Sequence, residues 1–190
     1  MIKNFFRHLH TVNKHRFLVF VHCCKVGMVW RGFIHDLSKY SPTEFFEGVK
    51  YYQGTRSPIT ACRNETGMSK AWLHHKGRNK HHPQYWFDPE CKQYLDMPYK
   101  YVVEKVCDML AASKVYKGKN YSTQYVYEYW QKIRGKREIG EKTKLFLDQV
   151  MLDLKDKGQK YVLNKKYMKS TYQAVFSQNL EDPLPEQGVN

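Results

Sequence analysis

Residues 35–46 read HDLSKYSPTEFF and carry the clearest structural signals in the chain. The run Ser41-Pro42-Thr43-Glu44 predicts the start of a helix, because it supplies an N-cap serine, a proline at the first helical position and a glutamate at the third. The doublet His35-Asp36 lies just before this start. An imidazole next to a carboxylate is a donor combination that suits zinc, manganese or iron. The stretch therefore joins a helix start to a candidate pair of metal ligands.

Helical periodicity dominates the chain on both sides of this stretch, so we predict an all-α fold. The strongest pattern covers residues 99–117, where five apolar residues between Val102 and Ala111 face inward. Residues 121–129 are rich in tyrosine and valine, which favour strands. Ser122 as a helix cap nevertheless favours a helix there.

The periodic segments and the breaks between them divide the chain into elements. Helices are predicted over residues 3–30 (one long or two short), from Ser41 through Tyr52, and over 68–75, 99–117, 122–133 and 141–155. Loops are predicted over residues 53–67, which hold Gly54, Pro58, Asn64 and Gly67, and over residues 76–98, which are rich in Gly, Asn, His and Pro. The last ten residues hold two prolines and predict a frayed tail.

Length and composition indicate one globular domain. With 190 residues, of which 42% are hydrophobic, the chain is large enough to bury a core. We expect this domain to cover residues 1–180 and the tail to cover residues 181–190. The longest apolar stretch, residues 17–24, is far shorter than the roughly 20 residues that cross a membrane. The basic N-terminus lacks the apolar core of a signal peptide, so the expected location is the cytoplasm.

The five cysteines form no CxxC pair and are odd in number, which argues against a disulfide framework or a zinc ribbon. We expect reduced thiols. The 32 lysines and arginines exceed the 18 acidic residues, for a net charge of +14. Such an excess attracts anions, so nucleotides, phosphate esters, nucleic acid and acidic membranes are candidate partners, and the charge does not choose among them. A basic protein without an anionic ligand is the alternative.

Asp108 lies in the middle of the apolar run Val106–Ala112. A buried carboxylate is costly unless a cation meets it. That cation is a lysine, an arginine or a metal ion, and an outward-facing Asp108 is the remaining alternative.

A second unusual feature is the segment HHKGRNKHHP at residues 74–83. Four of the nine histidines fall in it, and imidazole is a common ligand of catalytic metals. The interleaved cations Lys76, Arg78 and Lys80 suit a phosphate that the metal also contacts. The alternatives are a solvated polar loop and a metal scavenger without catalysis.

Within this segment, helical register with Trp72 and Met68 favours His75 over His74 as the inward residue. Between His81 and His82 the register does not decide. Upstream, His15 and His22 are seven residues apart and therefore share one helix face. Either of them can reach a site near His35.

The run His35-Asp36-Leu37-Ser38-Lys39 resembles the HD-x-[SG]-K signature of the HD superfamily of metal-dependent phosphohydrolases. In that superfamily a helix histidine precedes the doublet, further histidines follow, and an aspartate on a late helix comes last. The same order occurs here, from His15 to Asp108. The resemblance implies an HD-domain-like helical bundle. The candidate metal ligands are His15, His35, Asp36, His74, His75, His81, His82 and Asp108.

Longer motifs resemble an uncharacterised bacterial and phage family with HD-like features. This likeness covers roughly residues 8–130 and favours His15 as the first ligand. Its motifs in this chain are His15-Arg16, Cys24, Gly27, HDLSKYSPTEFF, Trp72-Leu73-His74-His75, Arg78-Asn79-x-His81-His82, Tyr85-Trp86 and Cys107-Asp108.

The HD resemblance implies a phosphohydrolase that holds one or two divalent ions of manganese, zinc, iron, cobalt or nickel. Such ions polarise a phosphate and lower the pKa of a water molecule. Lys39 and Arg78 are the candidate catalytic cations for the phosphoryl oxygens. The expected substrate is an anionic small molecule, such as a nucleotide or another phosphate ester.

Two other functions use the same residues. A minority of HD-like proteins are di-iron oxygenases, and four histidines with Asp36 and Asp108 can supply their ligand set. The third hypothesis is a basic nucleic-acid-binding module with a structural metal, which predicts salt-dependent binding without turnover. A structural site seldom needs six ligands, which disfavours this third hypothesis.

Overall fold

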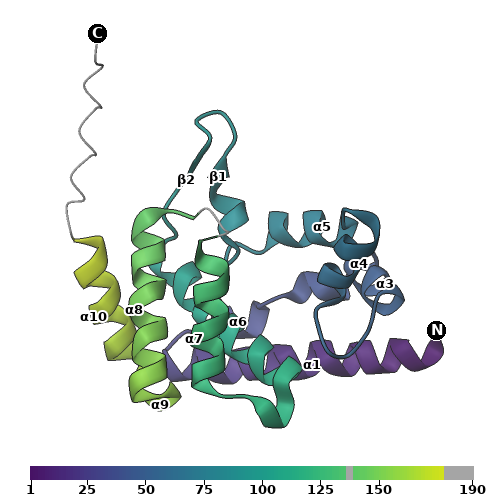
Figure 1. Cartoon of the computed structure of the whole chain (residues 1–190), viewed down its shortest axis with the longest axis horizontal. Helices are drawn as coiled ribbons and strands as arrows, with labels where there is room; N and C mark the ends of the chain where they lie inside the picture. The colour runs from purple at the N-terminus through teal and green to yellow at the C-terminus, as the bar shows by residue number, and fades with distance from the viewer. Residues whose placement is uncertain (136–138, 178–190) are drawn as a thin grey trace.

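The computed structural model describes residues 1–135 and 139–177, and within them the chain is almost entirely helical (Figure 1). The predicted all-α class is confirmed. The elements are α1 (Ile2–Lys25), α2 (Val29–Ile34), η1 (Leu37–Tyr40), α3 (Pro42–Lys50), α4 (Pro58–Thr66), α5 (Lys70–Arg78), η2 (Pro83–Trp86), β1 (Phe87–Asp88), β2 (Gln93–Tyr94), α6 (Tyr99–Lys117), η3 (Gly118–Asn120), α7 (Thr123–Arg134), α8 (Glu141–Lys157), α9 (Gln159–Val162) and α10 (Lys165–Phe176).

Helix α1 is the longest element and packs along α6 and α2. Its buried residues recur every three or four positions, as the periodicity of a helix requires. Histidines take positions in this stripe that an apolar residue would normally occupy. The buried positions of α1 are His8, Val12, His15, Val19, His22 and Cys23. The stripe therefore turns polar donors toward the interior of the protein.

Helices α3, α4 and α5 pack together beside the N-terminal half of α1 (Figure 1). The predicted helix start is confirmed, because the Ser41 side chain accepts a hydrogen bond from the Glu44 amide. Helix α5 is positioned by a second cap, in which Ser69 accepts from the Trp72 amide at 2.9 Å. Glu47 of α3 accepts from Ser69 and from the Lys70 amide. These bonds hold the histidines of α5 against α3.

On the other side of α6, helices α7, α8 and α10 complete the bundle (Figure 1). The helix predicted at 122–133 is confirmed as α7, and the Ser122 side chain caps it. The main hydrophobic core lies between these helices, α1 and α6, and it includes fully buried Trp130, Phe146 and Leu110. This packing makes α6 the central helix, so side chains on it lie in the interior.

Two predicted loops are corrected. Within residues 53–67 the chain forms α4, with Pro58 at its first position and Gly67 ending it in a left-handed conformation (φ 79°). The proline and glycine mark the ends of a helix rather than a loop. In residues 76–98, α5 continues to Arg78, and η2 and a small antiparallel hairpin of β1 and β2 follow. The predicted tail, residues 181–190, lies outside the described residues.

All five cysteines are free thiols, as expected. Among the described residues, none of the helices combines the length and apolar character that a membrane crossing requires.

Candidate metal centre

The HD doublet lies at a sharp turn between α2 and η1. Asp36 adopts a left-handed conformation (φ 52°, ψ 29°), which is uncommon for a residue with a side chain. Arg16 of α1 fixes the turn, because its guanidinium donates to the backbone oxygens of His35 at 2.8 Å and of Phe33 at 2.9 Å. Strained backbone of this kind persists where the surroundings hold it, typically at functional sites. The turn points the His35 and Asp36 side chains to the interior.

Four donor atoms from three segments converge at this turn. His15 Nε2 of α1 lies 3.4 Å from His35 Nε2, 3.6 Å from Asp36 Oδ2 and 3.2 Å from Asp108 Oδ1 of α6. His35 Nε2 lies 3.3 Å from Asp36 Oδ2. Ligands about 2.1 Å from one tetrahedral zinc ion are separated from one another by about 3.4 Å. This first donor group therefore has the atom types and spacing to hold a metal ion.

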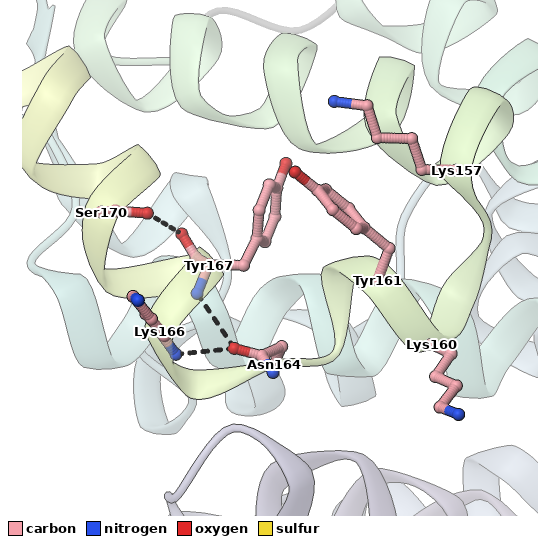
Figure 2. A pocket seen from close by; sticks show the side chains of 7 residues that line it. All are labelled: Lys157, Lys160, Tyr161, Asn164, Lys166, Tyr167 and Ser170. Atoms are coloured by element: carbon pink, nitrogen blue, oxygen red, sulfur yellow. Dashed lines mark hydrogen bonds between the residues drawn. The ribbon is translucent and has the colours of Figure 1, made fainter.

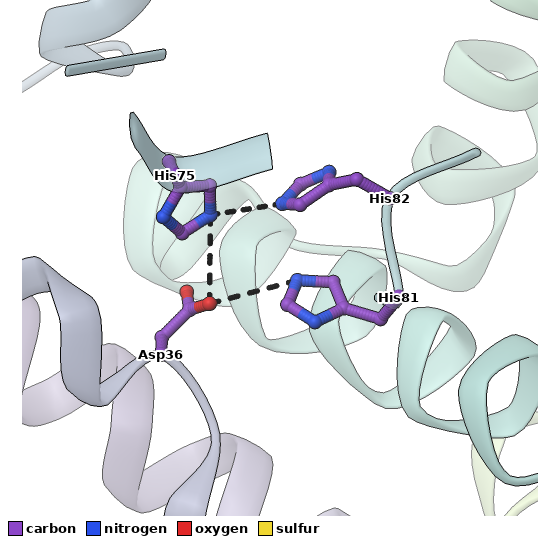
Figure 3. A group of neighbouring side chains, drawn as sticks. All are labelled: Asp36, His75, His81 and His82. Carbon is purple, nitrogen blue, oxygen red and sulfur yellow. Dashed lines mark hydrogen bonds and ion pairs between the residues drawn. The ribbon is translucent and has the colours of Figure 1, made fainter. Parts of the chain in front are cut away.

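A second donor group lies on the other side of the same carboxylate (Figure 3). Asp36 Oδ1 is 3.5 Å from His75 Nε2 and 3.6 Å from His81 Nε2. His75 Nε2 is 2.9 Å from His82 Nε2. Asp36 thus directs one oxygen to each group, in the way that a carboxylate bridges two ions.

Buried carboxylates orient a histidine in each group. His35 Nδ1 lies 2.9 Å from Glu104 Oε1, and Glu104 also pairs with Arg31. His75 Nδ1 lies 2.7 Å from Glu44 Oε2. A carboxylate only accepts, so each Nδ1 donates to its carboxylate, and Nε2 is the ring nitrogen turned toward the donor group. Metal-binding histidines are usually held in this way.

The family of the chain follows from one comparison. The model of a family of unknown function, DUF5662, matches residues 4–153. The chain belongs to the DUF5662 family. Neither a search of curated proteins nor a search of solved structures found a match. The DUF5662 match contains every residue of both donor groups, and it agrees with the expected membership of an uncharacterised family without showing an HD-domain family.

The centre of this DUF5662 protein contains buried polar atoms without hydrogen bonds, which are rare in proteins. Within the described chain, both ring nitrogens of His81 and both carboxylate oxygens of Asp36 are of this kind. Asp36 has ion-pair contacts only, of which the shortest, at 2.7 Å, joins Oδ2 to Lys39 Nζ. A bound cation would satisfy the acceptors among these atoms, which are the carboxylate oxygens of Asp36 and one ring nitrogen of His81.

Opposing effects set the protonation of the DUF5662 centre. Burial disfavours the charge on His35, but Asp36 and Glu104 outweigh burial and raise the His35 pKa to about 10. Burial also opposes the charge on Asp36 and Asp108, yet the surrounding cations and imidazoles hold both pKa values well below the usual range. Burial and the charge on His35 lower the pKa of His81. The ionised carboxylates and the neutral His81 imidazole are forms that bind metals, whereas His35 has to release its Nε2 proton when a metal binds.

The structure brings seven of the eight predicted ligands together. His74 is the exception, because its Nδ1 lies 2.6 Å from Glu44 Oε1 and it belongs to neither donor group. Helical register had favoured His75 over His74 on the assumption that Trp72 and Met68 face the core. His75 is the residue in the donor group, but Met68 is 54% exposed and does not face the core. His22 is buried away from the groups, with Nδ1 3.2 Å from the Cys107 oxygen. Of the two N-terminal alternatives, the structure thus places His15 at the centre.

The two candidate catalytic cations of the DUF5662 chain differ in position. Lys39 lies at the centre, where burial disfavours its charge but Asp36 and Asp108 raise its pKa. Arg78 is exposed in the last turn of α5 and makes no ion pair with any described residue. Only Lys39 contacts a donor group directly.

Sequence reasoning did not identify Glu104, Glu44 or Arg16 as parts of the centre. One signal was available for Glu104, because it lies one turn before Asp108 on α6 and therefore shares its helix face. Glu44 was read as part of a helix-capping pattern and of the longer family motif, without a role at the centre. Its side chain instead contacts His74 and His75.

Proposed function

We propose that this protein is a metal-dependent phosphohydrolase with a centre for two divalent ions, similar in chemistry to the HD superfamily. The observation that carries the proposal is the position of Asp36 between two donor groups, with one oxygen toward each. Together the groups offer five imidazoles and two carboxylates. The donors are His15, His35, Asp36 and Asp108 in the first group, and Asp36, His75, His81 and His82 in the second.

Divalent ions bound there would supply Lewis-acid chemistry, by polarising phosphoryl oxygens and lowering the pKa of water. The chain itself contributes charge and orientation. Lys39 Nζ, 2.7 Å from Asp36 Oδ2, places a positive charge beside the centre, where it stabilises negative charge that develops on a phosphoryl group. Glu104 and Glu44 keep two imidazoles in the tautomer that binds metals.

The substrate we propose is a nucleotide or another phosphate ester. The net charge of +14 favours the approach of an anion. Arg78, exposed one helical turn after His75, is proposed to contact outer phosphates of the substrate as it enters.

The test starts with the untagged protein, purified without added metal and analysed by elemental mass spectrometry. We expect one or two ions per chain of manganese, zinc, cobalt, nickel or iron, and metal-dependent turnover in a panel of nucleotides and phosphodiesters. Two irons per chain with oxygen consumption and no hydrolysis would assign an oxygenase instead.

Asp36→Asn is the decisive variant, because it keeps the shape of the side chain but removes the shared charge. We expect it to fold, to lose bound metal and to lose at least 100-fold in turnover. Asp156→Asn is the matched control, since Asp156 is an exposed residue of α8 and should leave both unchanged. Normal metal content and turnover in Asp36→Asn would overturn the site assignment.

A further inference from the structure

A cavity of about 610 Å³ lies between the end of α8, α9 and the start of α10, and it shares no residue with the metal centre (Figure 2). The family match ends at residue 153, so the cavity also lies beyond the matched segment. Its volume is in the range of small-molecule sites. The lining residues are Lys157, Lys160, Tyr161, Asn164, Lys166, Tyr167 and Ser170.

Positive charge is concentrated around this cavity. Residues 155–170 contain six lysines and one acidic residue, and all six lysines are exposed. Lys157 pairs with Asp153 at 2.8 Å. For Lys160 and Lys166, no carboxylate partner exists among the described residues. Their charges therefore remain available to an anionic ligand.

Two tyrosines form the apolar part of the cavity. The rings of Tyr161 and Tyr167 lie 4.9 Å apart and are tilted by 58°. The Tyr167 hydroxyl donates to Asp153 at 2.7 Å, which fixes that ring. Tyr161 is 44% exposed, and Figure 2 shows both rings directed into the space below the Lys157 ammonium. An exposed aromatic ring among lysines suits a ligand that has both a flat face and phosphates.

We propose that this cavity, formed by α8, α9 and α10, binds a single strand of nucleic acid. Lys160 and Lys166 contact phosphates. Lys157, which pairs with Asp153 and lies 4.8 Å from the centre of the Tyr161 ring, exchanges these contacts for a third phosphate when one base stacks on Tyr161. A duplex hides its base faces inside the stack, so a ring that binds by stacking selects unpaired bases. Lys169 is a further exposed lysine outside the cavity lining and lies on α10 one helical turn after Lys166. This favours a strand over a free nucleotide.

The test measures fluorescence anisotropy of a labelled oligothymidylate of about 12 residues with the full chain, as a function of salt. The triple variant Lys157→Gln/Lys160→Gln/Lys166→Gln is compared with Lys3→Gln/Lys119→Gln/Lys132→Gln. The second set removes the same net charge from exposed lysines elsewhere. We expect the cavity variant to bind at least 10-fold more weakly than the control variant. Its slope of log affinity against log salt should decrease in magnitude by about two, since each lost phosphate contact contributes about 0.7.

A second pair of variants tests the stacked base. Tyr161→Ala should weaken binding roughly 10-fold, while Tyr161→Phe keeps the ring and should bind like the unmodified chain. Equal affinity of the two triple variants, or no binding at low salt, would overturn the proposal. A third outcome would also overturn nucleic acid as the ligand. In it, inorganic polyphosphate competes as well as the unlabelled oligonucleotide, and Tyr161→Ala has no effect on binding. The cavity would then be a general surface for polyanions. These readouts measure binding, so they are independent of turnover at the metal centre.

Discussion

Asp36 and Glu104 show how the same functional group serves two purposes at the centre. Asp36 is met by the Lys39 ammonium at 2.7 Å and directs one oxygen to each donor group, while Glu104 is a carboxylate with hydrogen-bond partners on two sides, His35 and Arg31. A buried carboxylate is stable only where cations meet it, so the ionised Asp36 is suited to receive a metal ion as well as Lys39. Glu104 is already satisfied, so its contribution is to orient His35.

Glu104→Gln tests this orienting role. We expect the affinity for the metal to fall by about 10- to 100-fold, because a neutral amide holds the His35 Nδ1 proton less strongly. Isothermal titration of the metal-free protein measures the change. Glu128→Gln, in an exposed position of α7, is the control and should bind metal normally. Equal affinities in the two variants would show that Glu104 only supports packing.

The donors were predictable from sequence and their orienting partners were not, for a physical reason. A histidine or aspartate within an apolar stripe is conspicuous, as with His15 and Asp108. A glutamate on a helix looks like an ordinary solvent-facing residue, and its burial depends on which helices pack together. The left-handed conformation of Asp36 had no sequence signal either, because such a conformation is usually marked by glycine.

At the scale of elements, caps and periodicity predicted most helices, but loop-forming residues were read too literally. Residues 53–67 became a loop in the prediction because glycines and a proline were counted without regard to position. In the structure Pro58 starts α4 and Gly67 ends it. Composition alone does not distinguish a helix bounded by such residues from a loop made of them.

The spacing of α1 and α2 gives a prediction at this scale. A Cβ on Gly32 would lie 2.7 Å from the Cys23 Cβ and 3.0 Å from the Phe20 Cα, so Gly32→Ala would push the two helices apart. We expect a loss of about 1–3 kcal/mol in the free energy of unfolding. Weaker metal binding should follow, because His15 and His35 lie on either side of this contact. Urea denaturation measures the first effect.

Gly77→Ala is the matched control for Gly32→Ala. Gly77 lies inside α5, and nothing stands within 4 Å of an added Cβ. We expect a gain of about 0.5–1 kcal/mol from the higher helix propensity of alanine. The same sign for both substitutions would contradict the packing argument.

At the scale of the whole molecule, the central helix α6 joins the hydrophobic core to the donor groups. Its buried residues pack toward α7, α8 and α10, while Glu104 and Asp108 meet α1 and the turn at Asp36. Ligand binding at the centre and stability of the fold are therefore coupled. Any cation that binds the folded form stabilises it by mass action.

Removal of metal should consequently lower the melting temperature. At a metal concentration a thousandfold above the dissociation constant, the coupling is about 4 kcal/mol. For a chain of this size that corresponds to roughly 8–16 °C. Calorimetry before and after chelation measures the shift, and Asp36→Asn should show none. An unchanged melting temperature in the unmodified chain would contradict the proposed centre.

The position of Asp36 between the donor groups has a thermodynamic consequence. If Asp36 Oδ2 binds an ion in the first group, Asp36 Oδ1 has less freedom to move and less negative charge to offer to the second group. If each group holds an ion, filling one group changes the affinity of the other, with a coupling free energy that is the same in either order of filling. The affinity of each group would then be defined only together with the occupancy of its neighbour, and the two groups would act as one binding unit.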